Sequence, residues 1–266
     1  MNEGAFWVIG CGNMAGAMVR RWVETGMDIS SLHIVDPASP ELPGGLSAIQ
    51  SIPQDAPFAG RVMLAVKPQL LDMVSANVAR LVGPNTVLLS ILAGVEVAAL
   101  RERFPSAAQI IRVMPNLPAS LGKGVIGLHA ANGPDLAISD LMAPLGLVEW
   151  IADEEQLHLV AALAASGPAF LYRFVDALGV AAGRLGLAPD QSARLALAMV
   201  EGSAMLAAQS SDLPAMLAER VASKGGMTRE GLNVLDADEV LVKLLERTLE
   251  AARRRSAEMG EEAKRP

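Results

Sequence analysis

Short apolar runs alternate with helix-period segments along the first half of the chain. The runs suit strands that are buried on both faces of a sheet, and the intervening segments repeat apolar residues at the spacing of an amphipathic helix. This alternation predicts an α/β fold with a parallel, doubly wound sheet. The predicted strands are Ala5–Ile9, Leu32–Val35, Val62–Val66, Thr86–Ser90, Gln109–Val113, Gly124–His129 and Val148–Ile151, and the predicted helices are Met14–Thr25, Leu70–Leu81 and Val95–Phe104.

The pattern changes near residue 153, where long helical segments replace the strands. Acidic residues at 153–155 precede the first of these segments, as is favourable at a helix N-terminus. Twelve of the 16 prolines lie in residues 1–153, which suits short elements joined by turns. We therefore predict one domain over residues 1–153 and an all-helical domain over residues 154–266. The expected helices of the second domain begin near Pro168, Pro189, Leu213, Arg229 and Glu239, and the charged tail Gly260–Pro266 is expected to fray.

The chain is richer in apolar residues than a typical globular protein, and we expect these residues to be buried in a core or a subunit interface. Hydrophobic residues make up 52% of the chain and charged residues 19%. The longest apolar stretches, Val87–Leu100 and Leu157–Tyr172, are shorter than the ~20 residues that span a bilayer, and both contain polar residues. We therefore expect no membrane segment. Residues 157–209 carry few charges, which predicts a subunit interface.

Charge and cysteine content exclude further classes. The net charge is −7, and the basic triplet Arg253–Arg255 lies in a helical pattern, so we interpret it as a solvated helix face and expect no nucleic-acid partner. Cys11 is the only cysteine, which excludes an internal disulfide and suits a reducing, cytoplasmic location without a secretory signal. The chain has no H-E-x-x-H or C-x-x-C motif, so no metal site is predicted.

A glycine-rich turn joins the first predicted strand to the first helix. In this G-x-G-x-x-A pattern, Gly10 makes the turn, Gly12 lets the backbone approach a pyrophosphate, and Ala15 allows close packing of helix on sheet. Asp36 ends the second strand 21 residues after Ala15, where a carboxylate can bind a ribose hydroxyl. The first domain is therefore predicted to be a Rossmann-type dinucleotide-binding domain. Its first cofactor-binding candidates are Gly10, Cys11, Gly12, Asn13, Met14, Ala15 and Asp36.

Asp36 also bears on the choice between NADH and NADPH. A carboxylate favours the free 2′-hydroxyl of NADH, whereas NADPH needs positive partners for its 2′-phosphate. The stretch Asp36–Leu46 contains no Lys or Arg. The local sequence therefore favours NADH slightly, although a distant basic residue can also fold into the site.

Five further segments agree with one known family. They are VKPQ at 66–69, SILAG at 90–94, RVMPN at 112–116, SGPAF at 166–170 and SKGGMT at 223–228. Together with GCGNMA at 10–15, the chain resembles the pyrroline-5-carboxylate reductase family over almost its whole length. The resemblance implies NAD(P)H-dependent reduction of the cyclic imine 1-pyrroline-5-carboxylate to L-proline, the final step of proline biosynthesis. It also implies a homodimer built on interlocked helical domains, with assembly into a decamer as a further expectation.

The ends of the third to fifth strands supply further cofactor-binding candidates. Ligands bind at the carboxyl ends of strands in open α/β sheets, and small residues there leave room for a nicotinamide ring. Lys67 has an alternative interpretation as a surface lysine, and residues 114–116 as a plain turn after a strand. The candidates are Val66, Lys67, Pro68, Ala93, Gly94 and Asn116.

The segment Ser223–Thr228 predicts the substrate site. Two glycines run into a helix N-terminus, a place that binds carboxylates through backbone N–H groups. The resemblance implies that the substrate carboxylate lies here and that the Thr228 hydroxyl lies near the imine nitrogen; the alternative is an ordinary helix cap by Thr228. The resemblance also implies Glu154 or Glu155 near the substrate; the alternative is that both are simply helix-start charges. The catalytic candidates are Thr228 and Ser223, and the substrate-binding candidates are Gly225, Gly226, Met227, Lys224 and Glu154.

The chain departs from the family at the rim of this pocket. Lys224 stands where the family usually has proline, Met227 where it has Thr or Ala, and Arg220 where it has Asn. Two alternatives therefore stay open: a reductase of the six-membered cyclic imine, and a catalytically silent nucleotide-binding homologue. A protonated imine is a strong electrophile that needs positioning more than a potent acid, in keeping with the absence of a histidine dyad. His33, His129 and His158 are interpreted as structural or exposed.

Overall fold

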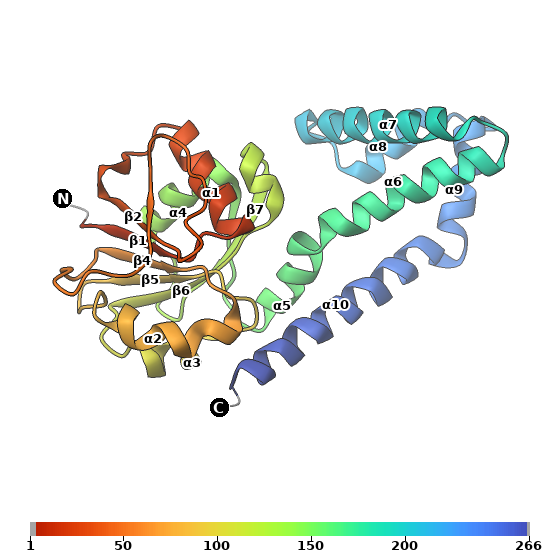
Figure 1. Cartoon of the computed structure of the whole chain (residues 1–266). Helices are drawn as coiled ribbons and strands as arrows, with labels where there is room; N and C mark the ends of the chain where they lie inside the picture. The colour runs from red at the N-terminus through yellow and green to blue at the C-terminus, as the bar shows by residue number, and fades with distance from the viewer. Residues whose placement is uncertain (1–3, 265–266) are drawn as a thin grey trace. The chain divides into compact units, whose positions relative to one another are not determined.

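A computed structural model of the chain describes residues 4–264 and divides them into two compact units. The first unit contains the residues up to Ser166 together with those from Glu250 onward, and the second is Gly167–Leu249. Figure 1 follows the chain through both. The last turns of the final helix therefore belong to the first unit, although they follow the second unit in the chain.

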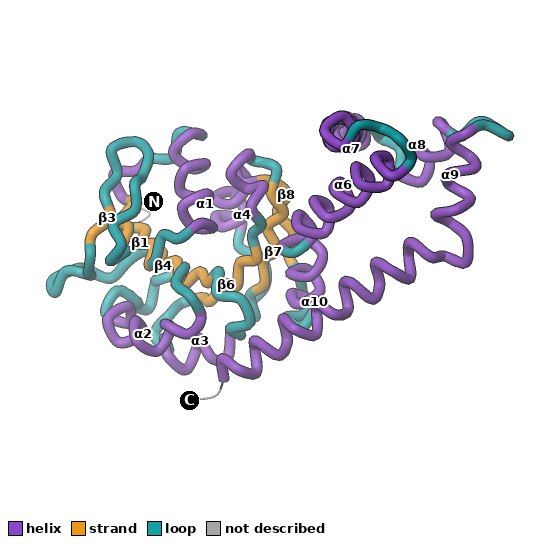
Figure 2. Tube along the Cα trace, turned by 45° about the vertical axis from the view of Figure 1, so that its right-hand side comes forward, coloured by secondary structure: helices purple, strands orange, loops and turns teal. Residues whose placement is uncertain are grey.

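One eight-stranded sheet forms the centre of the first unit. Its strand order is β3-β2-β1-β4-β5-β6-β7-β8, and neighbouring strands are parallel except for the antiparallel pair β6 and β7. The predicted doubly wound parallel sheet is therefore confirmed (Figure 2). The strands are β1 (Phe6–Ile9), β2 (Leu32–Val35), β3 (Ala48–Ile49), β4 (Arg61–Leu64), β5 (Val87–Ser90), β6 (Gln109–Met114), β7 (Gly124–His129) and β8 (Gly146–Trp150).

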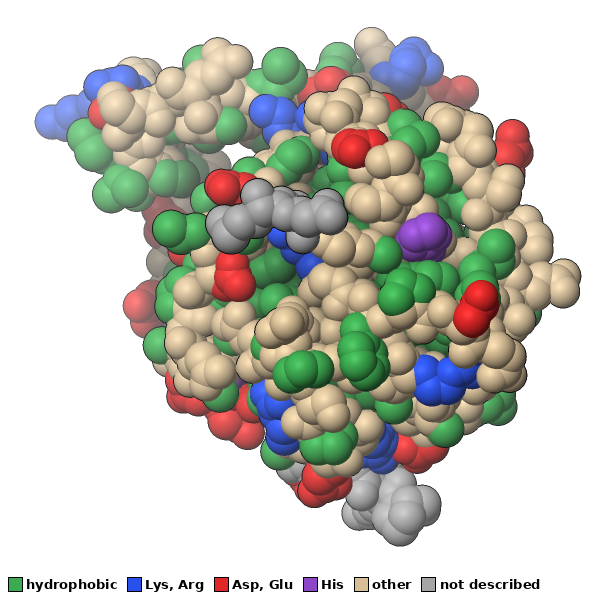
Figure 3. Space-filling view, turned by 90° about the vertical axis from the view of Figure 1, so that its left-hand side faces the viewer, with side chains coloured by type: hydrophobic (Ala, Val, Ile, Leu, Met, Phe, Trp, Pro, Cys, Tyr) green, Lys and Arg blue, Asp and Glu red, His purple; other side chains and the backbone are tan. Residues whose placement is uncertain are grey.

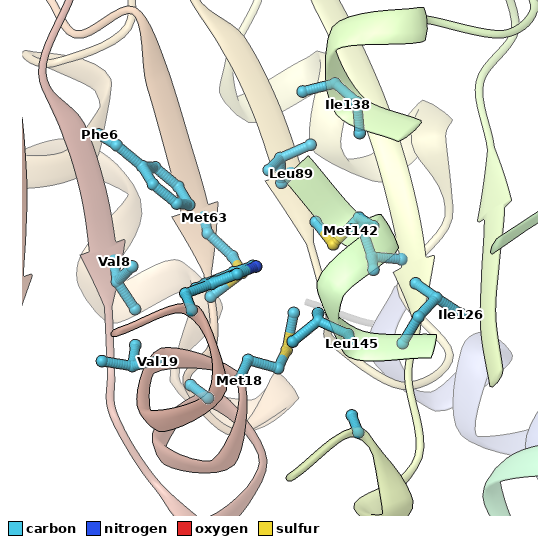
Figure 4. Packing of buried hydrophobic residues seen from close by; sticks show 14 of the residues in the cluster. Phe6, Val8, Met18, Val19, Met63, Leu89, Ile126, Ile138, Met142 and Leu145 are labelled. Carbon is cyan, nitrogen blue, oxygen red and sulfur yellow. The ribbon is translucent and has the colours of Figure 1, made fainter. Parts of the chain in front are cut away.

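Helices cover both faces of the sheet, and alternation along β1 shows why. Phe6 and Val8 point to the face covered by α1 and α4, while Trp7 and Ile9 point to the face covered by α2 and α3. Figure 4 shows part of the first of these two cores, where Phe6 lies among aliphatic and methionine side chains such as Val8, Met63 and Met142. The helices of this unit are α1 (Asn13–Glu24), α2 (Leu71–Ala79), α3 (Val97–Arg103), α4 (Leu136–Met142) and α5 (Gln156–Val160), followed by a π-helical turn (Ala161–Ala165).

Two elements of this unit were not predicted. Strand β3 has two residues, too few for a detectable alternation. Helix α4 has seven residues and begins at a cap in which an Asp135 carboxylate oxygen accepts the Ile138 N–H. The helix could have been predicted from this cap, because aspartate directly before an apolar segment is a common helix start.

The second unit consists of helices with very little interior of their own. Only Gly179, Ser192 and Ala196 are buried among its residues. Many large apolar side chains are exposed, including Leu195, Leu197, Met205 and Leu206 on α7. This surface contains much of the apolar excess and is suited to burial against another protein surface. The helices are α6 (Gly167–Arg184), α7 (Pro189–Gln209), α8 (Pro214–Val221), α9 (Met227–Asp236) and the first part of α10 (Val240–Lys264).

The last turns of α10 belong to the first unit and are ordered helix. Gly260 is buried, so the expectation of a frayed tail from residue 260 is wrong as far as residue 264. Close backbone packing, which the charged sequence does not reveal, holds this segment.

The basic triplet Arg253–Arg255 is exposed on the same helix. Arg253 pairs with Glu250 at 2.8 Å, and Arg255 pairs with Glu262 at 2.8 Å. The interpretation of Arg253–Arg255 as a solvated helix face is therefore confirmed.

Among the described residues, the helical stretch Gln156–Arg184 is long and apolar enough to cross a membrane by length and composition alone, and 17% of its most apolar part is buried. His158, Ser166 and Pro168 interrupt its apolar character.

On the face drawn in Figure 3, acidic and basic side chains are interspersed with apolar ones, and the described residues form no broad patch of one charge there.

Candidate functional site

The glycine turn after β1 has the geometry of a phosphate cradle. Gly10 has a φ of +88°, and a Cβ atom there would lie 2.8 Å from the Ala65 carbonyl oxygen, so this position requires glycine. A Cβ atom on Gly12 would meet nothing within 4 Å. Gly12 is exposed and is the N-cap of α1, and no side chain caps that helix. The first N–H groups of α1 therefore remain available to an anion.

A cavity of about 490 Å³ adjoins this turn at the carboxyl ends of the first strands. Its lining includes Gly10, Gly12, Asp36, Gln50 and Lys67. One concave site thus brings together three predicted parts: the glycine turn for the pyrophosphate, Asp36 for the ribose, and Lys67 after β4. Part of a dinucleotide is a chemical match for a cavity of this kind.

The Asp36 carboxylate is held by two backbone groups. One oxygen accepts the Cys11 N–H at 2.7 Å, and the other accepts the Ala38 N–H at 2.8 Å. Its negative charge is therefore fixed beside the glycine turn. Burial, with a smaller contribution from Asp36, raises the pKa of the Cys11 thiol to about 11. The thiol stays protonated near neutral pH and packs as a small side chain.

Two more turns with cofactor-binding candidates leave the same edge of the sheet. Val66, Lys67 and Pro68 follow β4, and the Lys67 side chain is exposed. Ala93 and Gly94 follow β5; Ala93 is exposed, whereas Gly94 is buried with a φ of +78°. Since β4 and β5 are parallel neighbours, their carboxyl ends present these two turns side by side.

Asn116 is buried, and backbone groups occupy both ends of its amide. Its Nδ2 donates to the Ala164 carbonyl at 2.9 Å, and its Oδ1 accepts the Val125 N–H at 2.9 Å. The amide thus connects the end of β6 with β7 and with the π-helical turn. These contacts give Asn116 a structural role, and its contact with a cofactor stays a prediction.

Glu154 lies in a partly buried polar cluster. Its Oε1 accepts the Val97 N–H at the start of α3 at 2.8 Å and pairs with Arg112 Nη1 at 2.9 Å. Arg112 is 2% exposed, and its Nη2 is buried with no hydrogen-bond partner in the described structure. Glu154 therefore fastens α3 to β6, and its contact with substrate stays a prediction.

Sequence reasoning missed the partners of Glu154. The available signal was an arginine inside an otherwise apolar strand, because a buried charge needs a partner. His158, also buried, joins the same cluster, with its Nδ1 2.9 Å from the Ser256 hydroxyl on α10. His129 Nδ1 lies 2.8 Å from the Ile151 carbonyl, and His33 stacks on Trp7. All three histidines are thus structural, as expected.

The glycine loop before α9 forms a second open helix N-terminus, in the second unit. Gly225 has a φ of +70°, and the Gly226 N–H donates to the Ser223 carbonyl at 3.0 Å. Gly226 is the N-cap of α9, and no side chain caps this helix. The predicted catalytic and substrate residues between 223 and 228 thus lie in this one turn, whereas Glu154 belongs to the first unit. Of these, Ser223, Lys224, Gly225 and Met227 are exposed, and Gly226 and Thr228 are half-buried.

The neighbouring charges are organised around α8. Arg220 forms an ion pair with Asp212, and Arg229 forms one with Glu219. The guanidinium of Arg220 is therefore bound to an aspartate rather than to the glycine loop. Lys224 is an exposed positive charge on the glycine loop itself.

Comparison with known proteins finds one family over both units. A family model described as pyrroline-5-carboxylate reductase dimerisation matches residues 154–259. A pyrroline-5-carboxylate reductase of Pasteurella multocida is 32% identical, covering 94% of this chain and 96% of the relative.

Solved structures share the fold of this chain. A pyrroline-5-carboxylate reductase from Coxiella burnetii matches with a TM-score of 0.86 and 29% identity, covering 100% of both chains. A pyrroline carboxylate reductase of Plasmodium falciparum with NADP bound matches with a TM-score of 0.80 and 24% identity, covering 98% of this chain and 99% of the other.

Proposed function

The chain belongs to the pyrroline-5-carboxylate reductase family, and from this membership we propose that it reduces 1-pyrroline-5-carboxylate to L-proline with a reduced nicotinamide cofactor. The observation that carries the proposal is the pair of open glycine loops, each at the N-terminus of a helix. One lies beside a cavity suited to part of a dinucleotide, and the other is suited to a carboxylate.

The first unit provides the cofactor-binding residues. The N–H groups at Gly12, Asn13 and Met14 face the pyrophosphate. Gly10 makes the turn, and Ala15 allows close packing of helix on sheet. Val66, Lys67, Pro68, Ala93 and Gly94 border the nicotinamide half, with Asn116 behind them. When bound, the cofactor supplies the hydride that reduces the C=N carbon.

NADH is proposed as the preferred cofactor. The Asp36 carboxylate is held in place by Cys11 and Ala38, so it meets the ribose as a fixed negative charge. A 2′-phosphate would bring like charge to the same place. Among the described residues that line the cavity, Lys67 is the only lysine or arginine.

The second unit provides the substrate residues. Backbone N–H groups at Gly225 and Met227 bind the substrate carboxylate, while the Gly226 N–H donates to the Ser223 carbonyl and closes the turn beneath it. Lys224 adds a positive charge. The Thr228 hydroxyl hydrogen-bonds at the imine nitrogen, where the product amine forms, and Ser223 supports the turn. This assignment needs no strong acid, since an iminium already accepts hydride readily.

The functional domains are proposed as residues 1–153 for the dinucleotide and 154–266 for substrate binding and dimerisation. Dimerisation covers the exposed apolar surface of α6 and α7, and assembly of dimers into a decamer is a further proposal. We assign the enzyme to the cytoplasm, where a free buried thiol such as Cys11 stays reduced.

Steady-state kinetics with a matrix of substrates tests this function. The purified protein is assayed with 1-pyrroline-5-carboxylate and with the six-membered cyclic imine carboxylate, each against NADH and NADPH. We expect the highest kcat/KM for the five-membered imine with NADH.

The other outcomes have distinct meanings. A higher kcat/KM for the six-membered imine would reassign the substrate and leave the reaction type intact. Higher efficiency with NADPH would overturn the role given to Asp36. No turnover in any combination, from protein that still binds NADH, would make the chain a silent homologue.

A further inference from the structure

The turn after β5 is packed against the end of the chain's last helix. A Cβ atom on Gly94 would lie 2.8 Å from the backbone nitrogen of Gly260, and one on Gly260 would lie 2.9 Å from the Gly94 carbonyl oxygen. The two backbones thus touch without an intervening side chain. Glycine at 94 is required by this contact and by its positive φ, in addition to any space needed for a ligand.

A hydrogen bond fixes the same helix one turn earlier. Ser256 is four residues before Gly260, so both lie on one face of α10. The Ser256 hydroxyl is 2.9 Å from Nδ1 of His158, which is 3% exposed on α5. The last turns of α10 are therefore attached by one buried side chain and one backbone contact.

The other side of the turn is held by the polar cluster. Val97, three residues after Gly94, donates its N–H to Glu154, and Arg112 holds that carboxylate at 2.9 Å. Three attachments thus surround a turn of a few residues: α10 at Gly94, Glu154 at Val97, and β5 itself. Ala93 remains exposed between them.

We propose that the segment Ser256–Gly260 positions the Ala93–Gly94 turn to receive the nicotinamide ring, with Gly260 and Ser256 as positioning residues. This inference rests on the proposed function, which places the ring at that turn. The two residues touch neither substrate nor cofactor and act through the backbone of Gly94. Since hydride transfer is sensitive to small displacements, a shift of this turn lowers the rate without unfolding the protein.

Gly260→Ala tests the proposal by a comparison of two ligands. The added methyl group must separate the backbones of residues 94 and 260. We expect NADH to bind about tenfold more weakly and kcat to fall at least about tenfold. ADP-ribose lacks the nicotinamide ring, so its dissociation constant stays within about twofold. Titration calorimetry measures the dissociation constants of NADH and ADP-ribose, and a steady-state assay measures kcat.

A matched control separates positioning from general damage. Gly231→Ala adds the same methyl group in α9, where a Cβ atom would meet nothing within 4 Å, and is expected to bind both ligands as the unaltered chain does. Equal weakening of NADH and ADP-ribose in Gly260→Ala would overturn the proposal, and so would unchanged NADH binding.

A second pair of variants keeps the proposal testable if Gly260→Ala does not fold. Ser256→Ala removes the partner of His158 and is expected to weaken NADH binding about two- to fivefold, as for loss of one hydrogen bond, with ADP-ribose unchanged. Ser256→Thr keeps the hydroxyl and restores NADH binding; failure of this rescue contradicts the proposal. Imine turnover by the unaltered protein reports separately on the proposed function.

Discussion

Arg112 and Glu154 form an ion pair at 2.9 Å in which the arginine side chain is 2% exposed and the glutamate 28%. Glu154→Ala leaves the guanidinium buried without its partner and also leaves the Val97 N–H without an acceptor. We expect the free energy of unfolding to fall by about 2–3 kcal/mol, less than for a fully buried pair because the glutamate is partly exposed. Urea denaturation measures this change.

The matched control for Glu154→Ala is Asp72→Ala, which breaks an ion pair on the surface of the same unit. Asp72 is 70% exposed and pairs with Arg103 at 2.6 Å. Its loss is expected to cost less than about 1 kcal/mol. If the free energy of unfolding fell by a similar amount in the two variants, the buried pair of Arg112 and Glu154 would contribute no more to stability than a surface ion pair.

The stability of the protein is expected to fall in mild acid because of His158. Burial, and then the positive charge of Arg112, hold the pKa of His158 below its usual 6.5, while Glu155, Glu96 and Glu154 oppose this shift. Below pH 6.5 the unfolded imidazole therefore binds a proton that the folded one does not. The stability from this group is present above that pH and is lost as the pH falls below it, by at most about 1.4 kcal/mol per pH unit for one proton.

Unfolding curves at pH 5.5 and 7.5 measure the contribution of His158. In His158→Gln the side chain no longer titrates, so the difference in unfolding free energy between the two pH values should shrink. An unchanged difference would assign the acid sensitivity to other groups.

Asp36→Asn is expected to shift cofactor choice toward NADPH. Removing the fixed negative charge removes repulsion of the 2′-phosphate, so the ratio of kcat/KM for NADPH to that for NADH should rise about tenfold, a change of about 1.4 kcal/mol. Asp140→Asn removes an exposed carboxylate from α4 and should leave the ratio unchanged. A rise of equal size in both variants would show a general charge effect.

Thr228→Ala is expected to lower kcat at least about tenfold, because it removes a hydroxyl that hydrogen-bonds the reacting nitrogen. Binding of NADH should not change, since Thr228 belongs to the loop assigned to the substrate. Thr228→Ser keeps the hydroxyl and should retain most of the turnover. If Thr228→Ala instead lost NADH binding, the assignment of the two loops to different ligands would be wrong.

Leu206→Glu is expected to shift the protein from dimer to monomer. Leu206 is 67% exposed on α7, and a carboxylate there makes burial against a second copy unfavourable. Light scattering after gel filtration reports the mass. Leu136→Glu is the matched control, because Leu136 is 81% exposed on α4 of the other unit and its variant should remain dimeric.

The sequence was sufficient to locate seven of the eight strands and both glycine loops, but not strand β3 or the antiparallel direction of β7. Periodicity located β1, β2, β4 and β5 to within a residue or two, because a strand buried on both faces is a continuous apolar run between turn residues. The cradle was predictable because Gly10 and Gly12 act through local backbone geometry, which neighbouring residues encode.

Contacts between distant segments were not predictable in the same way. Nothing near Gly260 indicates that Gly94 lies against it, and nothing near Asn116 indicates that Ala164 accepts its amide proton. Glu154 was expected near the substrate or as a helix-start charge, and His158 as structural or exposed. Their partners, Arg112 and Ser256, could not be named because only tertiary packing brings them together. Such pairings depend on the fold as a whole.

The first unit is built from two separate stretches of chain, and this has a consequence for biosynthesis. A ribosome adds about 5–20 residues per second, and the N-terminal part of the chain leaves it first. Residues 4–166 therefore emerge well before Ser256 and Gly260. During that interval the turn at Gly94 lacks its backing, and His158 lacks its hydroxyl partner. The sheet can form early, but the nucleotide-binding unit reaches its final structure only after the intervening 83 residues, Gly167–Leu249, have been synthesised.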